Sequence, residues 1–146
     1  MNKENLLKNG SFKEAVLKYV KKKYKSEIEY LWKTSPDAGV FRHEDNRKWY
    51  GLVMEVSRSK FGLSEKGYVC ALNVKTSDPM LHDILLQQNG FFPGYHMSKK
   101  SWISILLDGT VPFDRVCDMI DMSYQATAVK EKKAKLRSPK EKPPRE

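Results

Sequence analysis

The sequence lacks the features of several large classes of protein. Its 146 residues contain no apolar run of about 18 residues, the length that a membrane-spanning helix needs. The N-terminal stretch MNKENLLKNGSFKEAVLKYV also lacks the continuous apolar core of a secretory signal. We therefore expect a cytoplasmic protein that does not associate with membranes.

Cysteine and histidine are scarce, which argues against metal and thiol chemistry. The two cysteines, Cys70 and Cys117, fall in a predicted core strand and a predicted core helix. We expect both to be free and buried, as in a reducing compartment. The three histidines, His43, His82 and His96, are scattered, and no CxxC or HExxH spacing occurs, so no metal site is predicted.

Catalytic motifs are missing as well. Gly90 and Gly94 flank aromatic residues and form neither a Walker nor a GxGxxG phosphate loop. Cys117 lies within an apolar stripe, which is the setting of a core residue and not of an activated nucleophile. With no convergent catalytic set, we expect a binding module that is not an enzyme and needs no cofactor.

Positive charge is abundant but unevenly placed. The net charge is +9, and residues 130–146 alone hold eight Lys/Arg against three Asp/Glu. This segment is too polar to pack, so we expect one domain over residues 1–129 and a basic disordered tail over 130–146. The domain itself is only mildly basic, which weakens any argument for nucleic acid from charge alone.

Three helices are predicted. Ser11 followed by Glu14 forms a capping box for the first helix. Asp78 and Pro79 suit the cap and the first turn of the second, and the third runs from about Pro112 to Val129. The apolar stripes comprise Phe12, Ala15, Val16, Tyr19 and Val20 in the first helix, Leu81, Ile84 and Leu85 in the second, and Phe113, Val116, Cys117, Ile120 and Tyr124 in the third.

Five strands are predicted. Residues 40–43 and 49–57 form a hairpin around the polar turn 44–47, and a third strand follows Gly67. An aromatic loop from Phe91 to Tyr95 leads to a short strand near His96, and residues 102–107 form the last. The order α-β-β-β-α-β-β-α predicts an α+β fold with a mostly antiparallel sheet and helices packed on one face.

The alternation along these strands predicts which side chains face the core. Those expected inside are Tyr50, Leu52, Met54 and Val56, then Tyr68, Cys70, Leu72 and Val74, then Ile103, Ile105 and Leu107. Those expected on the opposite face are Trp49, Val53, Val69, Ala71, Trp102, Ser104 and Leu106. One side of the sheet would then carry tryptophans and small apolar residues outside the main core.

Short motifs between Val40 and Tyr124 resemble those of a known family, and the resemblance covers roughly residues 12–128. They are Val40-Phe41-Arg42-His43, Lys48-Trp49-Tyr50, Gly90-Phe91-Phe92-Pro93, His96-Met97, Lys100, Trp102, Leu107-Asp108-Gly109 and Met122-Ser123-Tyr124. Together they resemble the YjbR/MmcQ family, and the block from His96 to Gly109 is the most specific part. The resemblance implies a compact fold similar to secretion chaperones and comparable to frataxin-like proteins. It also implies DNA binding through a double-wing arrangement.

Basic and aromatic residues form the candidate site. Aromatic rings that stack on bases, next to cations that meet phosphates, are typical of nucleic-acid surfaces. The alternative is that the tryptophans simply pack beneath a helix or loop. The candidate nucleic-acid-binding residues are Arg42, Lys48, Trp49, Lys99, Lys100 and Trp102, with Lys99 and Lys100 at the tip of a projecting turn.

Two readings of the partner stay open. The first is DNA, and the second is a protein or peptide, because a half-apolar sheet face suits such partners. In either case we expect a monomer. Asp114, Asp118 and Asp121 are interpreted as a solvated helix face rather than a cation site, and such a face would repel phosphates.

Overall fold

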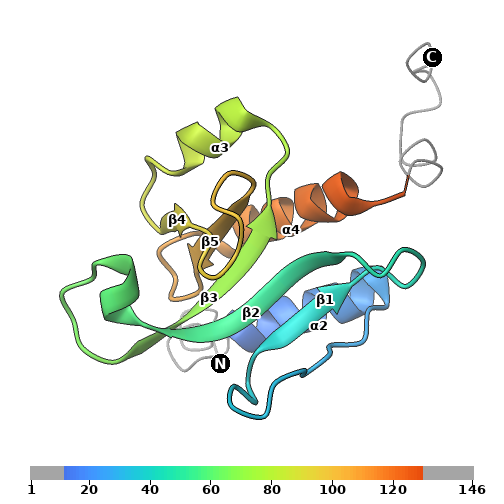
Figure 1. Cartoon of the computed structure of the whole chain (residues 1–146), viewed down its shortest axis with the longest axis horizontal. Helices are drawn as coiled ribbons and strands as arrows, with labels where there is room; N and C mark the ends of the chain where they lie inside the picture. Colours follow the sequence, from blue (N-terminus) through green and yellow to red (C-terminus); the bar gives the residue numbers. More distant parts are fainter. Residues whose placement is uncertain (1–11, 130–146) are drawn as a thin grey trace.

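A computed structural model describes residues 12–129, which form three α-helices and a five-stranded antiparallel sheet (Figure 1). The helices are α2 (Phe12–Tyr24), α3 (Pro79–Leu85) and α4 (Phe113–Thr127). The strands are β1 (Gly39–Arg42), β2 (Trp49–Ser57), β3 (Tyr68–Lys75), β4 (Phe91–Pro93) and β5 (Trp102–Leu106), and they lie in the order β1-β2-β3-β5-β4. The predicted fold class and element order are confirmed. The predicted cap at Ser11 and the predicted tail lie outside the described residues.

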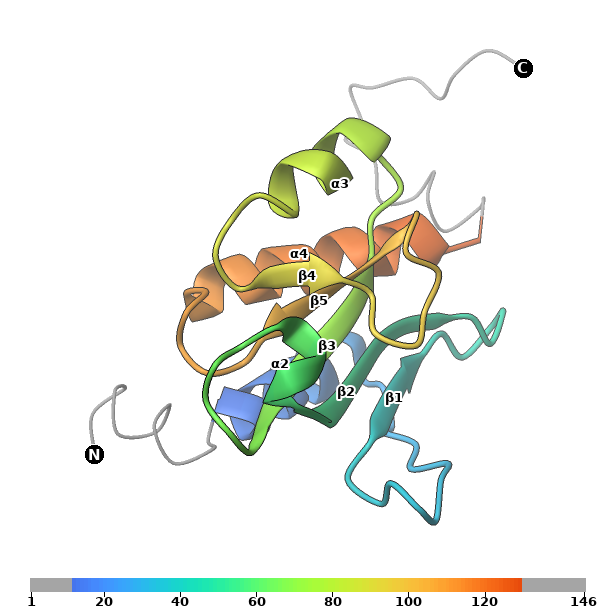
Figure 2. The same ribbon diagram turned by 60° about the vertical axis from the view of Figure 1, so that its left-hand side comes forward.

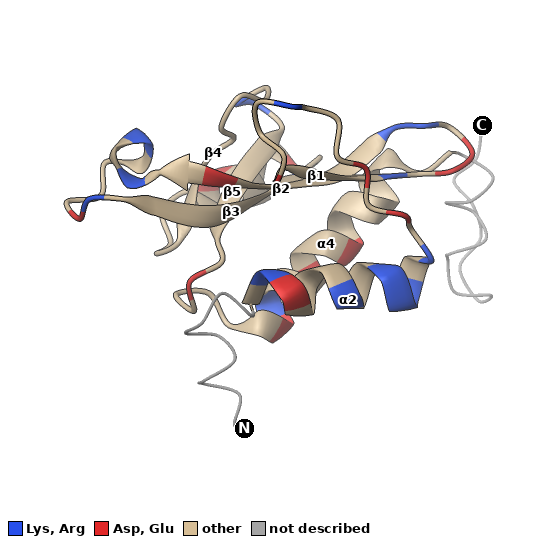
Figure 3. Cartoon of the chain, turned by 90° about the horizontal axis from the view of Figure 1, so that it is seen from below, with Lys and Arg blue, Asp and Glu red and all other residues tan. Residues whose placement is uncertain are grey.

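Two helices cover one face of the sheet. Figure 3 shows α2 and α4 on the same side, and the main core lies between them and the sheet. That core includes Val16, Leu72 and Ile120, all fully buried. Figures 1 and 2 both place α3 beyond the β4 side of the sheet. Within the described range, no helix is long and apolar enough to cross a membrane.

The short helix α3 begins as predicted, because the Asp78 side chain accepts a hydrogen bond from the Met80 N–H at 3.0 Å. Leu85 is fully buried, but Ile84 is 48% exposed, so its predicted place on the apolar side is wrong. His82 is buried instead. Hydrophobicity alone could not identify His82 as a buried residue, because its burial depends on polar partners.

The predicted facing of β2 is wrong after its first residues. Tyr50 and Val53 both belong to the main core, whereas Leu52 and Met54 lie with Trp49 on the opposite face. A β-bulge is the cause, because Gly51 pairs with Phe41 and Trp49 with Arg42, which leaves Tyr50 as an extra residue. A side chain at residue 51 would collide with the Phe41 ring, so glycine is required there.

The fourth strand is not where the sequence predicts it. Phe91 pairs with Ile105 and Phe92 with Ser104, so the strand lies in the aromatic segment that was expected to be a loop. His96 lies in the following turn with a left-handed φ of 61°. The strand β4 lies at the edge of the sheet, where proline is tolerated, so Pro93 can end it.

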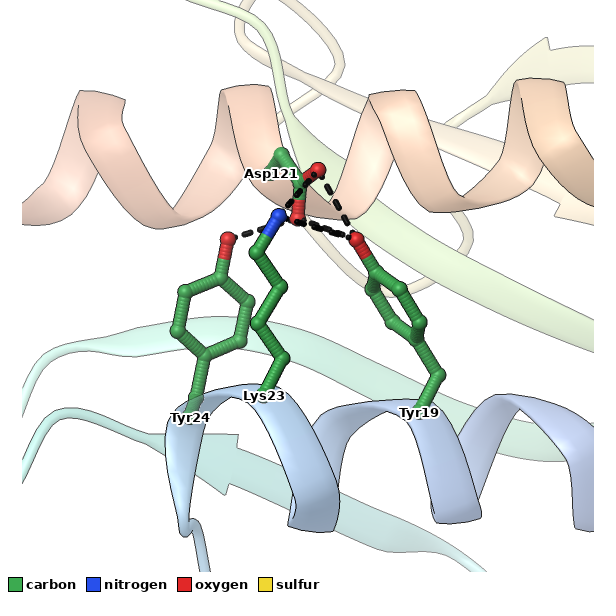
Figure 4. A network of polar contacts seen from close by, with 4 residues as sticks. All are labelled: Tyr19, Lys23, Tyr24 and Asp121. Atoms are coloured by element: carbon green, nitrogen blue, oxygen red, sulfur yellow. Dashed lines mark hydrogen bonds and ion pairs between the residues drawn. The ribbon is translucent and has the colours of Figure 1, made fainter.

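An acidic side chain joins the two large helices. Asp121 of α4 accepts hydrogen bonds from the hydroxyl groups of Tyr19 (2.8 Å) and Tyr24 (2.6 Å), and its carboxylate lies 2.9 Å from the Lys23 ammonium (Figure 4). The interpretation of a solvated face is therefore wrong for Asp121. Asp114 and Asp118 are exposed, in agreement with that interpretation.

Candidate functional site

The two candidate tryptophans start two strands that run parallel to each other on either side of β3. Because β3 runs antiparallel to both β2 and β5, these two strands begin at the same end of the sheet. Trp49 is the first residue of β2 and Trp102 is the first of β5. Both point to the face opposite α2 and α4, which we call the outer face, since Ile103 lies in the main core and side chains alternate. The predicted facing of both tryptophans is confirmed.

Trp49 belongs to a second, smaller apolar cluster on the outer face. It packs with Met54 and Met97 against the buried residues Ala38, Val40 and Leu52. Its ring meets the Trp32 ring edge to face, with 5.9 Å between centroids. The side chain is half-buried, so the expectation that Trp49 packs beneath a loop holds in part, and part of its ring stays accessible.

An apolar hollow of about 300 Å³ opens beside this cluster. Its apolar walls come from Trp32, Ala38, Trp49, Leu52, Met54 and Met97. Thr34, Ser35 and His96 add polar groups, and none of the lining residues is acidic. The sequence prediction missed Trp32 and Met97, because both lie in irregular segments where no periodicity assigns a facing; the apolar run Tyr30-Leu31-Trp32 in a polar connector was the available signal.

The basic candidates differ in how free their charges are. Arg42 is largely buried, with its Nε 3.2 Å from the Glu29 carboxylate, and its guanidinium lies 5.8 Å from the Trp49 ring centroid. Lys48 is exposed in the β1–β2 turn. Lys99 and Lys100 are exposed in the turn before β5, where the Lys99 ammonium donates to the Gly94 carbonyl at 3.0 Å. The structure thus assigns Arg42 to a local ion pair and leaves the lysines facing solvent.

Buried polar groups hold the turn of residues 94–101 in place. The His82 Nε2–H donates to the Lys99 carbonyl at 2.9 Å, and its Nδ1 bonds the Thr76 hydroxyl. On the other side of the turn, the Asn73 amide donates to the Tyr95 carbonyl at 3.1 Å. The sequence prediction missed both anchors. They fix the position from which Lys99, Lys100 and Met97 are presented.

The other half of the outer face is covered. Phe61 packs on Phe92 with 4.9 Å between ring centroids and a 34° tilt between the rings, and it meets Tyr95 edge to face. On this face, four residues expected on an open surface are buried: Val69, Ala71, Ser104 and Leu106. The predicted facing of these four residues is right, whereas Val53, also expected on this face, lies in the main core. The open surface is limited to the half of the face that carries Trp49 and Trp102.

A second hollow, of about 320 Å³, has a polar lining in which positive and negative side chains balance. It is lined by Tyr24, Glu29, Arg42, His43, Arg47 and Tyr124, among others. Its lining holds three basic and three acidic side chains (Lys25, Arg42 and Arg47 with Glu27, Glu29 and Glu44), and Glu29 lies within 3.2 Å of both arginines, so the charges on its walls compensate one another. His43 is buried beside it and bonds the Thr127 hydroxyl at 2.8 Å. This neutral arrangement does not favour an anionic partner.

Neither cysteine has the setting of a nucleophile. Cys117 is buried and Cys70 half-buried, and both are free thiols. Burial raises the pKa of Cys70 to about 12 and that of Cys117 to about 11, which disfavours the reactive thiolate. Among residues 12–129, no three His, Cys, Asp or Glu side chains gather closely enough to hold a metal ion.

The fold and the site define an α+β protein in which two helices cover one face of a sheet and loops shape the other. The chain belongs to the YjbR family, whose model matches residues 21–126. It is 39% identical to the uncharacterized protein YyaQ of Bacillus subtilis over 79% of this chain and 97% of that one. It is 36% identical to the uncharacterized protein YjbR of Escherichia coli K12 over 76% of this chain and 94% of that one.

A solved structure supports the fold. A crystal structure of a protein from Pseudomonas syringae is similar, with a TM-score of 0.76 and 33% sequence identity. The similarity covers 88% of this chain and the whole of that one. The relatives therefore establish family and architecture, while the role of the site depends on its own chemistry.

Proposed function

We propose that this protein binds nucleic acid through one end of the outer sheet face. This strand-end surface consists of Lys48, Trp49, Lys99, Lys100 and Trp102. The observation that carries the proposal is that the β2-β3-β5 pairing brings both tryptophans to the same end and face. The exposed lysines lie in the turns that precede these two tryptophans. Aromatic rings beside cations suit a partner with bases and phosphates.

The lysines and the arginine have different roles in this proposal. Lys48 and Lys100 are exposed, and a lysine ammonium meets phosphates as a point charge with little base selectivity. Arg42 is held by Glu29 and orients the Trp49 ring instead of reaching a phosphate. The expected binding is therefore strongly salt-dependent and nearly independent of sequence.

The test removes two charges from the proposed surface. Lys48→Ala/Lys100→Ala should weaken binding to DNA of any sequence and make the salt slope shallower by about one unit per lost phosphate contact. Fluorescence anisotropy of a labelled oligonucleotide over a salt series measures both quantities. Folding should change by no more than about 0.5 kcal/mol, as is usual for exposed side chains.

The matched control removes two charges elsewhere. Lys21 and Lys22 are exposed on α2, in the layer on the other side of the sheet. Lys21→Ala/Lys22→Ala has the same net charge as the test variant, so an equal loss of affinity in both would show that only total charge matters. That result would remove the strand-end surface from the proposal.

A peptide partner is the second candidate. The apolar hollow, together with the exposed Tyr30 and Leu31 that precede its Trp32 in the chain, also suits an apolar segment. Salt separates the two functions, because affinity for nucleic acid falls steeply as salt rises, whereas an apolar interface hardly responds. A binding partner whose affinity is unchanged by salt would favour the peptide.

A further inference from the structure

The apolar hollow is a concave feature of the outer face with two tryptophans in its lining. Trp32 and Trp49 meet there with their ring planes at 79°, so two aromatic walls form a corner. Met54 and Met97 complete the walls with flexible thioethers that adapt to flat groups. Trp32 is still 38% exposed, so an incoming ring can reach it. The hollow therefore suits an aromatic ring inserted from solvent.

Charge and polarity around the hollow indicate what carries that ring. Its lining contains no acidic side chain. Close by in the chain, three lysines (Lys33 beside Trp32, Lys48 beside Trp49, and Lys99 two residues after Met97) outnumber two acidic residues (Asp37 beside Ala38 and Glu55 beside Met54). Figure 3 shows the connection between α2 and β1 crossing to the outer face. The surroundings thus favour an aromatic group on a negatively charged chain.

We propose that the hollow receives an unpaired nucleobase, so that single-stranded nucleic acid is the preferred ligand. This inference rests on the proposed function and makes it more specific. A base in a duplex is stacked on both faces and paired along one edge, so it cannot enter a hollow of this kind without being extruded. A base in a single strand can stack on Trp32 or Trp49, while Thr34, Ser35 and His96 offer hydrogen bonds to its edge.

The experiment compares three ligands of equal length on the full chain. They are a single-stranded oligothymidylate, a duplex, and an abasic oligomer that keeps the phosphates but lacks bases. The single strand should bind tightest at any one salt concentration and should quench tryptophan fluorescence. Trp32→Ala should lower affinity for the oligothymidylate about tenfold, the usual scale for one stacked base, and leave the abasic oligomer unaffected.

Two control variants make the comparison specific. Tyr68→Ala removes a 68% exposed aromatic ring at the far end of the sheet and should change nothing. Trp32→Phe keeps an aromatic wall and should retain most of the preference for single strands. Circular dichroism checks that each variant is folded, and if Trp32→Ala is not, Met97→Ala tests the opposite wall in the same way.

The outcomes separate this inference from the proposed function. Equal binding of Trp32→Ala and the unaltered protein to the single strand, with lysine-dependent binding to the duplex retained, would overturn the base site and leave the nucleic-acid surface in place. Absence of binding to all three ligands would overturn both. Fluorescence quenching by an apolar tryptophan-containing peptide, lost in Trp32→Ala and unaccompanied by any effect of oligothymidylate, would assign the hollow to a peptide.

Discussion

The Arg42 guanidinium contacts two neighbouring side chains of the protein. Its guanidinium lies against Glu29 on one side and over the Trp49 ring on the other. Such a cation is largely neutralised, and its contact with the ring limits the orientations that Trp49 can adopt. The sequence places Arg42 correctly at a strand end, but it contains no signal that pairs it with Glu29, because an isolated bridge between Glu29 and Val40 brings the two together.

Cys70 makes the stability of the protein sensitive to alkaline pH. Its pKa is raised by burial from 9.0 to about 12, so between these values the unfolded chain binds fewer protons than the folded one. Stability should therefore be fully present below the unfolded pKa and fall as pH rises toward the folded pKa. Cys117, whose pKa is about 11, acts in the same direction.

A cysteine variant isolates this effect. Replacing Cys70 with Ala removes one titrating thiol, so the free energy of unfolding should fall less steeply between about pH 8 and about pH 9, where unfolded tyrosines are still almost fully protonated. Urea denaturation at several pH values measures the slope. An identical slope in the variant and the unaltered protein would show that the Cys70 thiol does not titrate differently on unfolding.

At the scale of elements, the apolar pattern predicts most helices and strands, and it fails where a bulge or a buried polar contact decides which side chains face the core. Amphipathic periodicity is sufficient to predict α2 and α4. Tyr68, expected inside at the start of β3, is 68% exposed, but strand alternation is sufficient to predict the rest of β3 and β5. It fails at the β2 bulge, because one extra residue reverses the alternation without changing composition. It also fails at α3, where His82 is buried through its bonds to Thr76 and Lys99.

Asp121 is predicted to stabilise the packing of α4 on α2. Its carboxylate accepts hydrogen bonds from Tyr19 and Tyr24 and pairs with Lys23, so Asp121→Ala leaves two tyrosine hydroxyls without their acceptor. The free energy of unfolding should fall by about 1–3 kcal/mol, the usual scale for hydrogen bonds to a charged group. Urea denaturation measures the change.

The same helix offers a control for that change. Asp118 is exposed, and Asp118→Ala removes the same charge from α4 with an expected effect within about 0.5 kcal/mol. Equal destabilisation by the two variants would mean that helix charge, and not the Asp121 contacts, accounts for the loss.

At the scale of the whole molecule, the candidate site was predicted in part. Alternation predicted that Trp49 and Trp102 share one face. Their common end depends on the pairing of β5 with β3, two strands that are not consecutive in the chain, and the sequence did not predict that pairing. The apolar hollow was not predictable, because Trp32 and Met97 come from segments without periodicity that are far apart in the sequence. Such segments are positioned by long-range contacts such as those of Asn73 and His82 with the turn of residues 94–101.

The central claim is that the folded domain itself, and not the basic segment after it, binds nucleic acid. The most direct measurement is the salt dependence of DNA binding by a chain that ends at Val129, because residues 130–146 carry more than half of the net positive charge. We predict that the shortened protein still binds, with affinity that falls steeply as salt rises and a slope that is shallower in Lys48→Ala/Lys100→Ala. Binding no stronger than that of a neutral protein of equal size would contradict the account and assign the interaction to the segment that was removed.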